Sequence, residues 1–174
     1  MGRTVVLLGP PGSGKSTIGV ELARLGLRWR DWESWILESW GTRERFVANK
    51  AEALASLHEA ILHFIDGAET PAVIESTGLS DHDFLDRLCQ DYPGTFIVRL
   101  DVSEAEALKR VAARVQGRHL SDAIEGNRAV WQAFQVVVVP SRAVGLVIDT
   151  ELLAQSLAAA EILRALEATP QRSE

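Results

Sequence analysis

Near its start the chain reads Gly9-Pro10-Pro11-Gly12-Ser13-Gly14-Lys15-Ser16-Thr17. This stretch, called the phosphate loop below, matches G-x-x-x-x-G-K-[ST], the Walker A pattern that holds the phosphates of a nucleoside triphosphate. An apolar run, residues 4–8, precedes the loop, and residues 15–25 follow it with isoleucine and leucine at helical spacing. A strand, a glycine-rich turn and a helix are the context that the pattern requires. We therefore expect a nucleoside triphosphate site at this point of the chain.

The composition of the loop follows from the chemistry of phosphate binding. Backbone N–H groups must converge on phosphate oxygens, which requires glycines that accept unusual φ angles and leave no side chain in the way. The start of the following helix adds partial positive charge. Lys15 is expected to reach the β- and γ-phosphates, Ser16 to bind Mg²⁺ and Thr17 to donate to the α-phosphate. The residues predicted to bind the nucleotide are Gly12, Ser13, Gly14, Lys15, Ser16 and Thr17.

Short apolar runs alternate with helical patterns along the rest of the chain. The expected strands are residues 4–8, 27–30, 72–75, 95–101 and 144–148. The expected helices are residues 15–25, 34–40, 43–65, 81–90, a helix capped by Ser103 with Glu106 as its capping-box partner, 125–134 and 151–166. Residues 135–139 fit either a strand or a helix end. Strands separated by helices predict an α/β fold with about five parallel strands and helices on both faces.

The composition is that of an ordinary globular protein. With 174 residues and 47% apolar content, the chain suffices for one hydrophobic core, so we expect a single domain over residues 1–168. Within it, polar residues 116–124 predict a short lid, and residues 169–174 a frayed tail. Cys89 stands alone, which excludes an internal disulfide and favours a cytoplasmic location. No apolar run approaches the roughly 18 residues of a membrane helix.

The net charge of −6 disfavours a broad nucleic-acid surface, and a monomer is the default expectation, with a dimer as the alternative.

Several carboxylates follow strands, at the sheet edge where open α/β folds bind their ligands. Asp31 and Glu33 come just after the second expected strand. Asp31 can accept the proton of an acceptor hydroxyl or hold a Mg²⁺-bound water, although both residues also suit an acidic cap on the next helix. Glu75 ends the third strand opposite the phosphate loop, the Walker B position for holding Mg²⁺ through water. Asp101 is a rival for that role, but its place before Ser103 favours helix capping.

Taken together, these features resemble the small AAA-type P-loop kinases grouped with shikimate kinase and, more distantly, the nucleoside monophosphate kinases. The resemblance covers nearly the whole chain. The matching segments are Gly9–Thr17, Asp31-Trp32-Glu33, residues 36–41, residues 72–78, residues 100–103, Arg118-His119-Leu120, residues 128–131 and residues 147–150. It implies the P-loop NTPase fold, ATP and Mg²⁺ as cofactors, and phosphoryl transfer to a small molecule.

The resemblance also implies roles for individual residues. Asp31 looks like the carboxylate that meets Mg²⁺-bound water and the acceptor hydroxyl, and Glu33 like an acceptor-binding acid. Arg118 resembles the lid arginine that closes onto the transferring phosphate. Arg128 resembles an arginine that clamps the acceptor, and Arg110 falls where the family packs an arginine on adenine.

The chain departs from the shikimate kinase pattern around the acceptor. The Phe-Arg pair early in the long helix is absent, and Ser76-Thr77-Gly78 replaces a run of three glycines, with Gly78 kept as a candidate acceptor contact. Shikimate is therefore not the expected acceptor. Four tryptophans, Trp29, Trp32, Trp35 and Trp40, lie beside the acidic pair. Trp32 and its neighbours can line a pocket for a flat or hydrophobic acceptor, or form a small core or an oligomer contact.

The sequence thus favours a kinase that moves the γ-phosphoryl group of ATP to a hydroxyl of a small molecule. Lys15, Asp31 and Arg118 are its expected catalytic residues, and Ser16, Asp31 and Glu75 its expected Mg²⁺ residues. One alternative is a nucleotide-dependent switch without a small-molecule acceptor. Another is a phosphotransferase that uses the same site on a nucleotide, an RNA end or an antibiotic.

Overall fold

The computed structural model of the chain describes residues 3–66, 69–115, 119 and 123–169. Within these residues five strands form one sheet in the order β2-β3-β1-β4-β5, and every neighbouring pair is parallel. The strands are β1 Thr4–Leu8, β2 Arg28–Trp29, β3 Ala72–Ser76, β4 Thr95–Asp101 and β5 Leu146–Asp149. The predicted α/β fold with about five parallel strands is confirmed.

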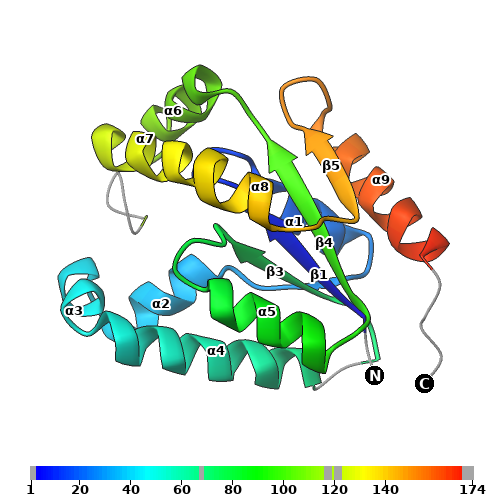
Figure 1. Cartoon of the computed structure of the whole chain (residues 1–174), viewed down its shortest axis with the longest axis horizontal. Helices are drawn as coiled ribbons and strands as arrows, with labels where there is room; N and C mark the ends of the chain where they lie inside the picture. The colour runs from blue at the N-terminus through cyan, green and yellow to red at the C-terminus, as the bar shows by residue number, and fades with distance from the viewer. Residues whose placement is uncertain (1–2, 67–68, 116–118, 120–122, 170–174) are drawn as a thin grey trace.

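Helices cover both faces of the sheet (Figure 1). They are α1 Lys15–Arg24, α2 Trp32–Trp40, α3 Arg43–Ala48, α4 Lys50–Asp66, α5 His82–Asp91, α6 Glu104–Ala112, α7 Ile124–Ala133, the π-helix η1 Phe134–Val138, α8 Val139–Ser141 and α9 Gln155–Ala168. Among the described residues, no helix has the length and apolar character needed to cross a membrane.

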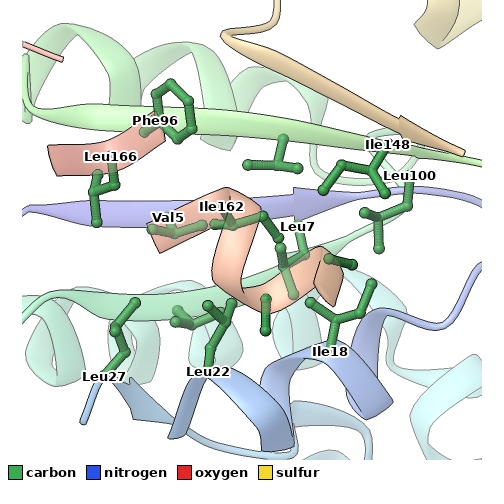
Figure 2. Close-up of a cluster of buried hydrophobic side chains, with 14 residues drawn as sticks. Val5, Leu7, Ile18, Leu22, Leu27, Phe96, Leu100, Ile148, Ile162 and Leu166 are labelled. Carbon is green, nitrogen blue, oxygen red and sulfur yellow. The ribbon is translucent and has the colours of Figure 1, made fainter. Parts of the chain in front are cut away.

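Two hydrophobic layers explain why β1 is apolar from Val5 to Leu8. Val5 and Leu7 face a cluster built with α1 and α9, which Figure 2 shows with Ile18, Leu22 and Ile162. The alternate residues of β1, Val6 and Leu8, join a second cluster on the other face, with side chains from α4, α5 and η1. Because a central parallel strand is buried on both faces, its side chains are apolar without alternation.

The long helix expected over residues 43–65 is wrong, because the chain breaks it at Asn49. Helix α3 ends at Ala48 and α4 begins at Lys50, with Asn49 at φ −120° and ψ 34° between them. The Asn49 side-chain amide donates to the Arg45 carbonyl at 2.9 Å. Asparagine side chains compete in this way with the backbone for carbonyl oxygens, which favours helix ends.

Residues 135–139, left open between strand and helix, are helical. Phe134–Val138 forms a π-helix in which the N–H of Val139 donates to the carbonyl of Phe134. Pro140 lies in the first turn of the short helix α8 that follows, where its missing N–H is tolerated. The last helix is also later than expected, beginning at Gln155 rather than at residue 151.

The capping expected at the start of α6 is half right. The Ser103 hydroxyl accepts from the N–H of Glu106 at 3.3 Å, as an N-cap does. Glu106 does not return the bond, because its carboxylate binds Lys109 and Arg110 on its own helix, while the N–H of Ser103 donates to Glu151. Asp101 does not cap this helix; it ends β4 and pairs with Arg99 at 2.8 Å.

Candidate active site

The phosphate loop lies at the centre of the sheet, between β1 and α1. Its first residue is tied to the neighbouring strand, since the N–H of Gly9 donates to the Ser76 carbonyl at 3.1 Å. The carboxyl ends of β1 and β3 therefore meet at the loop, which is where open parallel sheets bind ligands.

Two glycines shape the loop with left-handed backbone angles, Gly12 at φ +82° and Gly14 at φ +85°. A Cβ on Gly12 would lie 2.3 Å from the Ala107 carbonyl oxygen of α6, so the loop packs directly on that helix. At Gly14, by contrast, a Cβ would meet none of the described residues within 4 Å. Gly14 is also the N-cap of α1, whose first turn holds no acidic residue. An open, positively polarised helix start fits a phosphate group.

Lys15 folds back over this loop. Its Nζ donates to the carbonyl oxygens of Gly9 at 2.7 Å and Pro10 at 3.0 Å. Burial lowers the pKa of Lys15 from 10.5 to about 8, while the negative charge of Glu75 opposes this change. The positive charge of Arg114 lowers the pKa further, whereas Glu33 and Asp81 raise it. Charged residues from four separate segments thus act electrostatically on the Lys15 ammonium group.

Glu75 and Ser16 form the candidate Mg²⁺ site. The Ser16 hydroxyl donates to Glu75 Oε2 at 2.9 Å, and the Trp29 indole N–H donates to Glu75 Oε1 at 2.7 Å. Burial raises the pKa of Glu75, although Lys15 and both hydrogen bonds act against this shift. Magnesium prefers one or two carboxylates with phosphate oxygens and waters, so a serine hydroxyl and a carboxylate beside a phosphate loop fit this ion.

Asp31 caps α2 and also lies near Glu75. Its Oδ1 accepts from the N–H of Ser34 at 3.0 Å, and its Oδ2 accepts from the Ser34 hydroxyl at 2.7 Å. The capping role that the sequence left open is therefore present. The negative charge of Asp31 contributes to the raised pKa of Glu75, which places the two carboxylates in one electrostatic field. A role for Asp31 in phosphoryl transfer stays a prediction.

Arg110 braces the phosphate loop. Its guanidinium donates to the Gly12 carbonyl at 3.3 Å, to the Thr150 hydroxyl at 3.0 Å and to the Thr150 carbonyl at 2.9 Å, and pairs with Glu106 at 3.0 Å. These bonds join α6, the loop and the turn after β5. Stacking of Arg110 on adenine stays a prediction, and its position beside the loop is compatible with it.

The acceptor residues expected from the resemblance are spread more widely. Glu33 of α2 pairs with His119 at 3.0 Å, which brings part of the expected lid against α2. Arg118 lies outside the described residues, as do most of residues 116–122 and residues 170–174. Arg128 pairs with Glu104 at 2.9 Å and so joins α7 to α6. Its clamping of an acceptor stays a prediction.

Trp32, one of the four tryptophans of the cluster, is a core residue. It is only 4% exposed and packs edge-on against Trp35 and Phe64, with ring centroids 6.0 and 5.4 Å away. The guanidinium of Arg30 lies over the Trp32 ring, 5.5 Å from its centroid. Gly78 is tightly enclosed as well, since a Cβ there would lie 2.9 Å from Leu8. A direct acceptor contact by either residue stays a prediction.

A family model described as an AAA domain matches residues 5–131. The chain belongs to this family. The predicted resemblance to small P-loop kinases is confirmed at the level of the family and the fold.

Solved structures show the same fold. Shikimate kinase from Acinetobacter baumannii in complex with shikimate has a TM-score of 0.69 and 20% identity, covering 95% of this chain and 93% of that chain. Deoxyadenosine kinase from M. mycoides with bound dATP has a TM-score of 0.64 and 15% identity, covering 95% and 100%. A sugar kinase from Janibacter sp. has a TM-score of 0.65 and 18% identity, covering 98% and 97%. A search of curated proteins found no match.

Two residues of this AAA domain, Asp81 and Arg114, reach the site without having been singled out from the sequence, and Trp29 was named only as a member of the tryptophan cluster. Trp29 binds Glu75, and the strand register that joins them is invisible in the sequence alone. Asp81 accepts from the Ser76 hydroxyl at 2.6 Å, and its other oxygen is buried with no partner among the described residues. Arg114 acts electrostatically on Lys15. In the sequence, its spacing of one helical turn from Arg110 is the feature that could have placed it beside the site.

Proposed function

We propose that this protein is an ATP-dependent kinase that transfers the γ-phosphoryl group to a hydroxyl of a small-molecule acceptor. The observation that carries this proposal is the meeting of Lys15, Ser16 and Glu75 at the mouth of the phosphate loop, with Ser16 Oγ 2.9 Å from Glu75 Oε2. A cation, a hydroxyl and a carboxylate are the groups needed beside a triphosphate and its metal ion. The similar folds of shikimate, deoxyadenosine and sugar kinases support it.

The loop residues would bind and neutralise the triphosphate. The space beside Gly14 leaves room for a phosphate group at the start of α1, and Lys15 would exchange its two loop carbonyls for phosphate oxygens. Ser16 and Glu75 would hold Mg²⁺, which supplies further charge neutralisation of the phosphates when it is bound. Because phosphoryl transfer requires little covalent chemistry from the protein, positioning and charge account for most of the rate.

Asp31 would accept the proton of the acceptor hydroxyl. The acceptor oxygen attacks the γ-phosphorus, the bond from that phosphorus to the bridging oxygen breaks, and ADP leaves with the electron pair. The hydroxyl proton passes to a carboxylate oxygen of Asp31 and from there to water. Helix α2 holds this carboxylate in place through Ser34.

The proposal is tested by measuring ADP production from Mg·ATP with pooled hydroxyl compounds, including sugars, polyols, nucleosides and hydroxy acids. The kinase proposal predicts that one pool raises ADP production well above the rate with ATP alone. Binding of ATP without stimulation by any pool would contradict it and favour a nucleotide-dependent switch.

Asp31→Asn is expected to lower acceptor-stimulated turnover about 100- to 10,000-fold, the range for removing a general base. Asparagine is also a good N-cap, so α2 and the thermal midpoint of unfolding should change little. The matched control is Asp66→Asn at the end of α4, where the carboxylate binds Tyr92. A rate for Asp31→Asn equal to that of the control would exclude Asp31 as the base.

The lowered pKa of Lys15 predicts how nucleotide affinity depends on pH. Phosphates bind the charged ammonium group, so affinity is full below pH 8 and declines as the pH rises through about 8. Between pH 7 and 9 the dissociation constant for ADP should increase about tenfold, as one titrating group requires. Calorimetric titrations at several pH values measure this. Lys15→Met should bind weakly with a flat profile, and a flat profile in the unaltered protein would contradict the prediction.

A further inference from the structure

We propose that Trp29 is a positioning residue that orients the Glu75 carboxylate for Mg²⁺, an inference that rests on the proposed function and its metal site. Trp29 itself touches neither nucleotide nor metal in this account. Its indole N–H binds Glu75 Oε1 at 2.7 Å, while Glu75 Oε2 faces the Ser16 hydroxyl at 2.9 Å. The two oxygens of the Glu75 carboxylate therefore have separate roles. Oε1 is anchored by the indole, and Oε2 is directed toward the ion.

The strand register brings Trp29 to this place. On the short edge strand β2, Trp29 pairs with Val73 of β3, and Glu75 lies two residues further along β3. Directly paired residues and residues two apart share one face of a sheet, so Trp29 and Glu75 both project toward α1. That face also holds Val73 and Ile18, and Trp29 packs against their cluster.

Helix α1 leaves room for the indole at Gly19. A Cβ on Gly19 would lie 2.1 Å from Trp29 Nε1 and 2.4 Å from its Cδ1, far inside van der Waals contact. A glycine inside a helix is less favourable than alanine, so this position costs helix stability. What the glycine provides is direct contact between the indole edge and the helix backbone, within reach of Glu75.

The anchor matters because the carboxylate is partly buried. Burial is the largest cause of the raised pKa of Glu75, and a buried oxygen without a hydrogen bond is unfavourable. Without the indole, Oε1 would compete with Oε2 for Ser16 and Lys15, and the carboxylate would rotate away from the ion. Partners that orient metal-binding groups in this way typically contribute 10- to 100-fold to metal affinity.

The test compares the dissociation constant of ADP with and without Mg²⁺, measured by calorimetry without any acceptor. For Trp29→Phe we expect the factor by which Mg²⁺ strengthens ADP binding to fall about tenfold, with Mg²⁺-free binding unchanged. Trp131→Phe is the matched control, because it removes another indole hydrogen bond, to the Val102 carbonyl at 3.1 Å, away from the site. It should keep the full Mg²⁺ effect.

A second variant and a second measurement separate positioning from folding. Gly19→Ala keeps the indole but displaces it, and should reduce the Mg²⁺ effect as Trp29→Phe does. In nitrogen–proton NMR spectra without metal, the signal that is lost in Trp29→Phe is that of the Trp29 indole. We expect this signal to shift in Glu75→Gln. An unchanged Mg²⁺ effect in Trp29→Phe, beside a clear one in the unaltered protein, would overturn this inference alone. No Mg²⁺ effect in the unaltered protein would overturn the proposed metal site and the inference with it.

Discussion

Lys15→Ala is expected to lower acceptor-stimulated turnover about a thousandfold or more. In the proposed function Lys15 would supply the positive charge at the β- and γ-phosphates, where negative charge must be stabilised in the transition state. Its half-buried ammonium group loses part of its hydration, which lowers its pKa to about 8 and opposes folding. The alanine variant should therefore unfold at the same or a higher temperature while losing activity. Steady-state ADP production and thermal unfolding, measured on the same sample, check both expectations.

Lys109→Ala provides the control for this variant. Lys109 lies on α6 with its side chain 77% exposed and pairs with Glu106 on the helix surface. Surface ion pairs of this kind contribute little, so activity and stability should stay near those of the unaltered protein. If Lys15→Ala retained more than a tenth of the activity, the phosphate loop would not be the catalytic nucleotide site.

Gly12→Ala is expected to destabilise the folded protein by about 3 kcal/mol, a value typical of forced overpacking combined with an unfavourable backbone angle. The added methyl group would lie 2.3 Å from the Ala107 carbonyl oxygen, and backbone atoms on both sides resist movement. Urea unfolding without nucleotide measures the change. The phosphate loop and α6 should separate, and ADP binding should weaken as a consequence.

Gly14→Ala isolates the contribution of the clash. Gly14 has nearly the same left-handed angle as Gly12, but an added Cβ there would meet no described residue within 4 Å. Only the unfavourable backbone angle then destabilises the Gly14→Ala variant, by about 1–2 kcal/mol. Equal losses for the two alanine variants would show that packing of the loop on α6 contributes nothing.

The fold could be predicted from the sequence because its signals are local. The phosphate loop lies between a continuous apolar run and a helical pattern, and both β1 and α1 follow from these. Asn49 shows the limit of such patterns, since hydrophobic spacing continues through α3 and α4 while one side-chain hydrogen bond breaks the helix. Residues 135–139 show the same limit, since their consecutive valines favour a strand while the chain forms η1 and the start of α8 there.

The site was less predictable, because its contacts depend on strand register. The sequence identifies Lys15, Ser16 and Glu75 by their positions at a loop and a strand end, and the fold brings them together. Trp29 could not be matched to Glu75, since 46 residues separate them and only the pairing of β2 with β3 joins them. Arg128 is the opposite case. Its sequence position suggests a contact with the acceptor, whereas in the structure its side chain pairs with Glu104.

The fate of the γ-phosphoryl group distinguishes a kinase from an ATPase or a nucleotide-dependent switch. The protein is incubated with Mg²⁺, ATP labelled with ³²P at the γ-position and the pooled hydroxyl compounds, and the products are separated by chromatography. We expect label in an organic phosphate ester from one pool, and no such labelled ester with Lys15→Ala. Label found only in inorganic phosphate, or remaining in ATP with every pool, would contradict the assignment as a kinase of small-molecule hydroxyls.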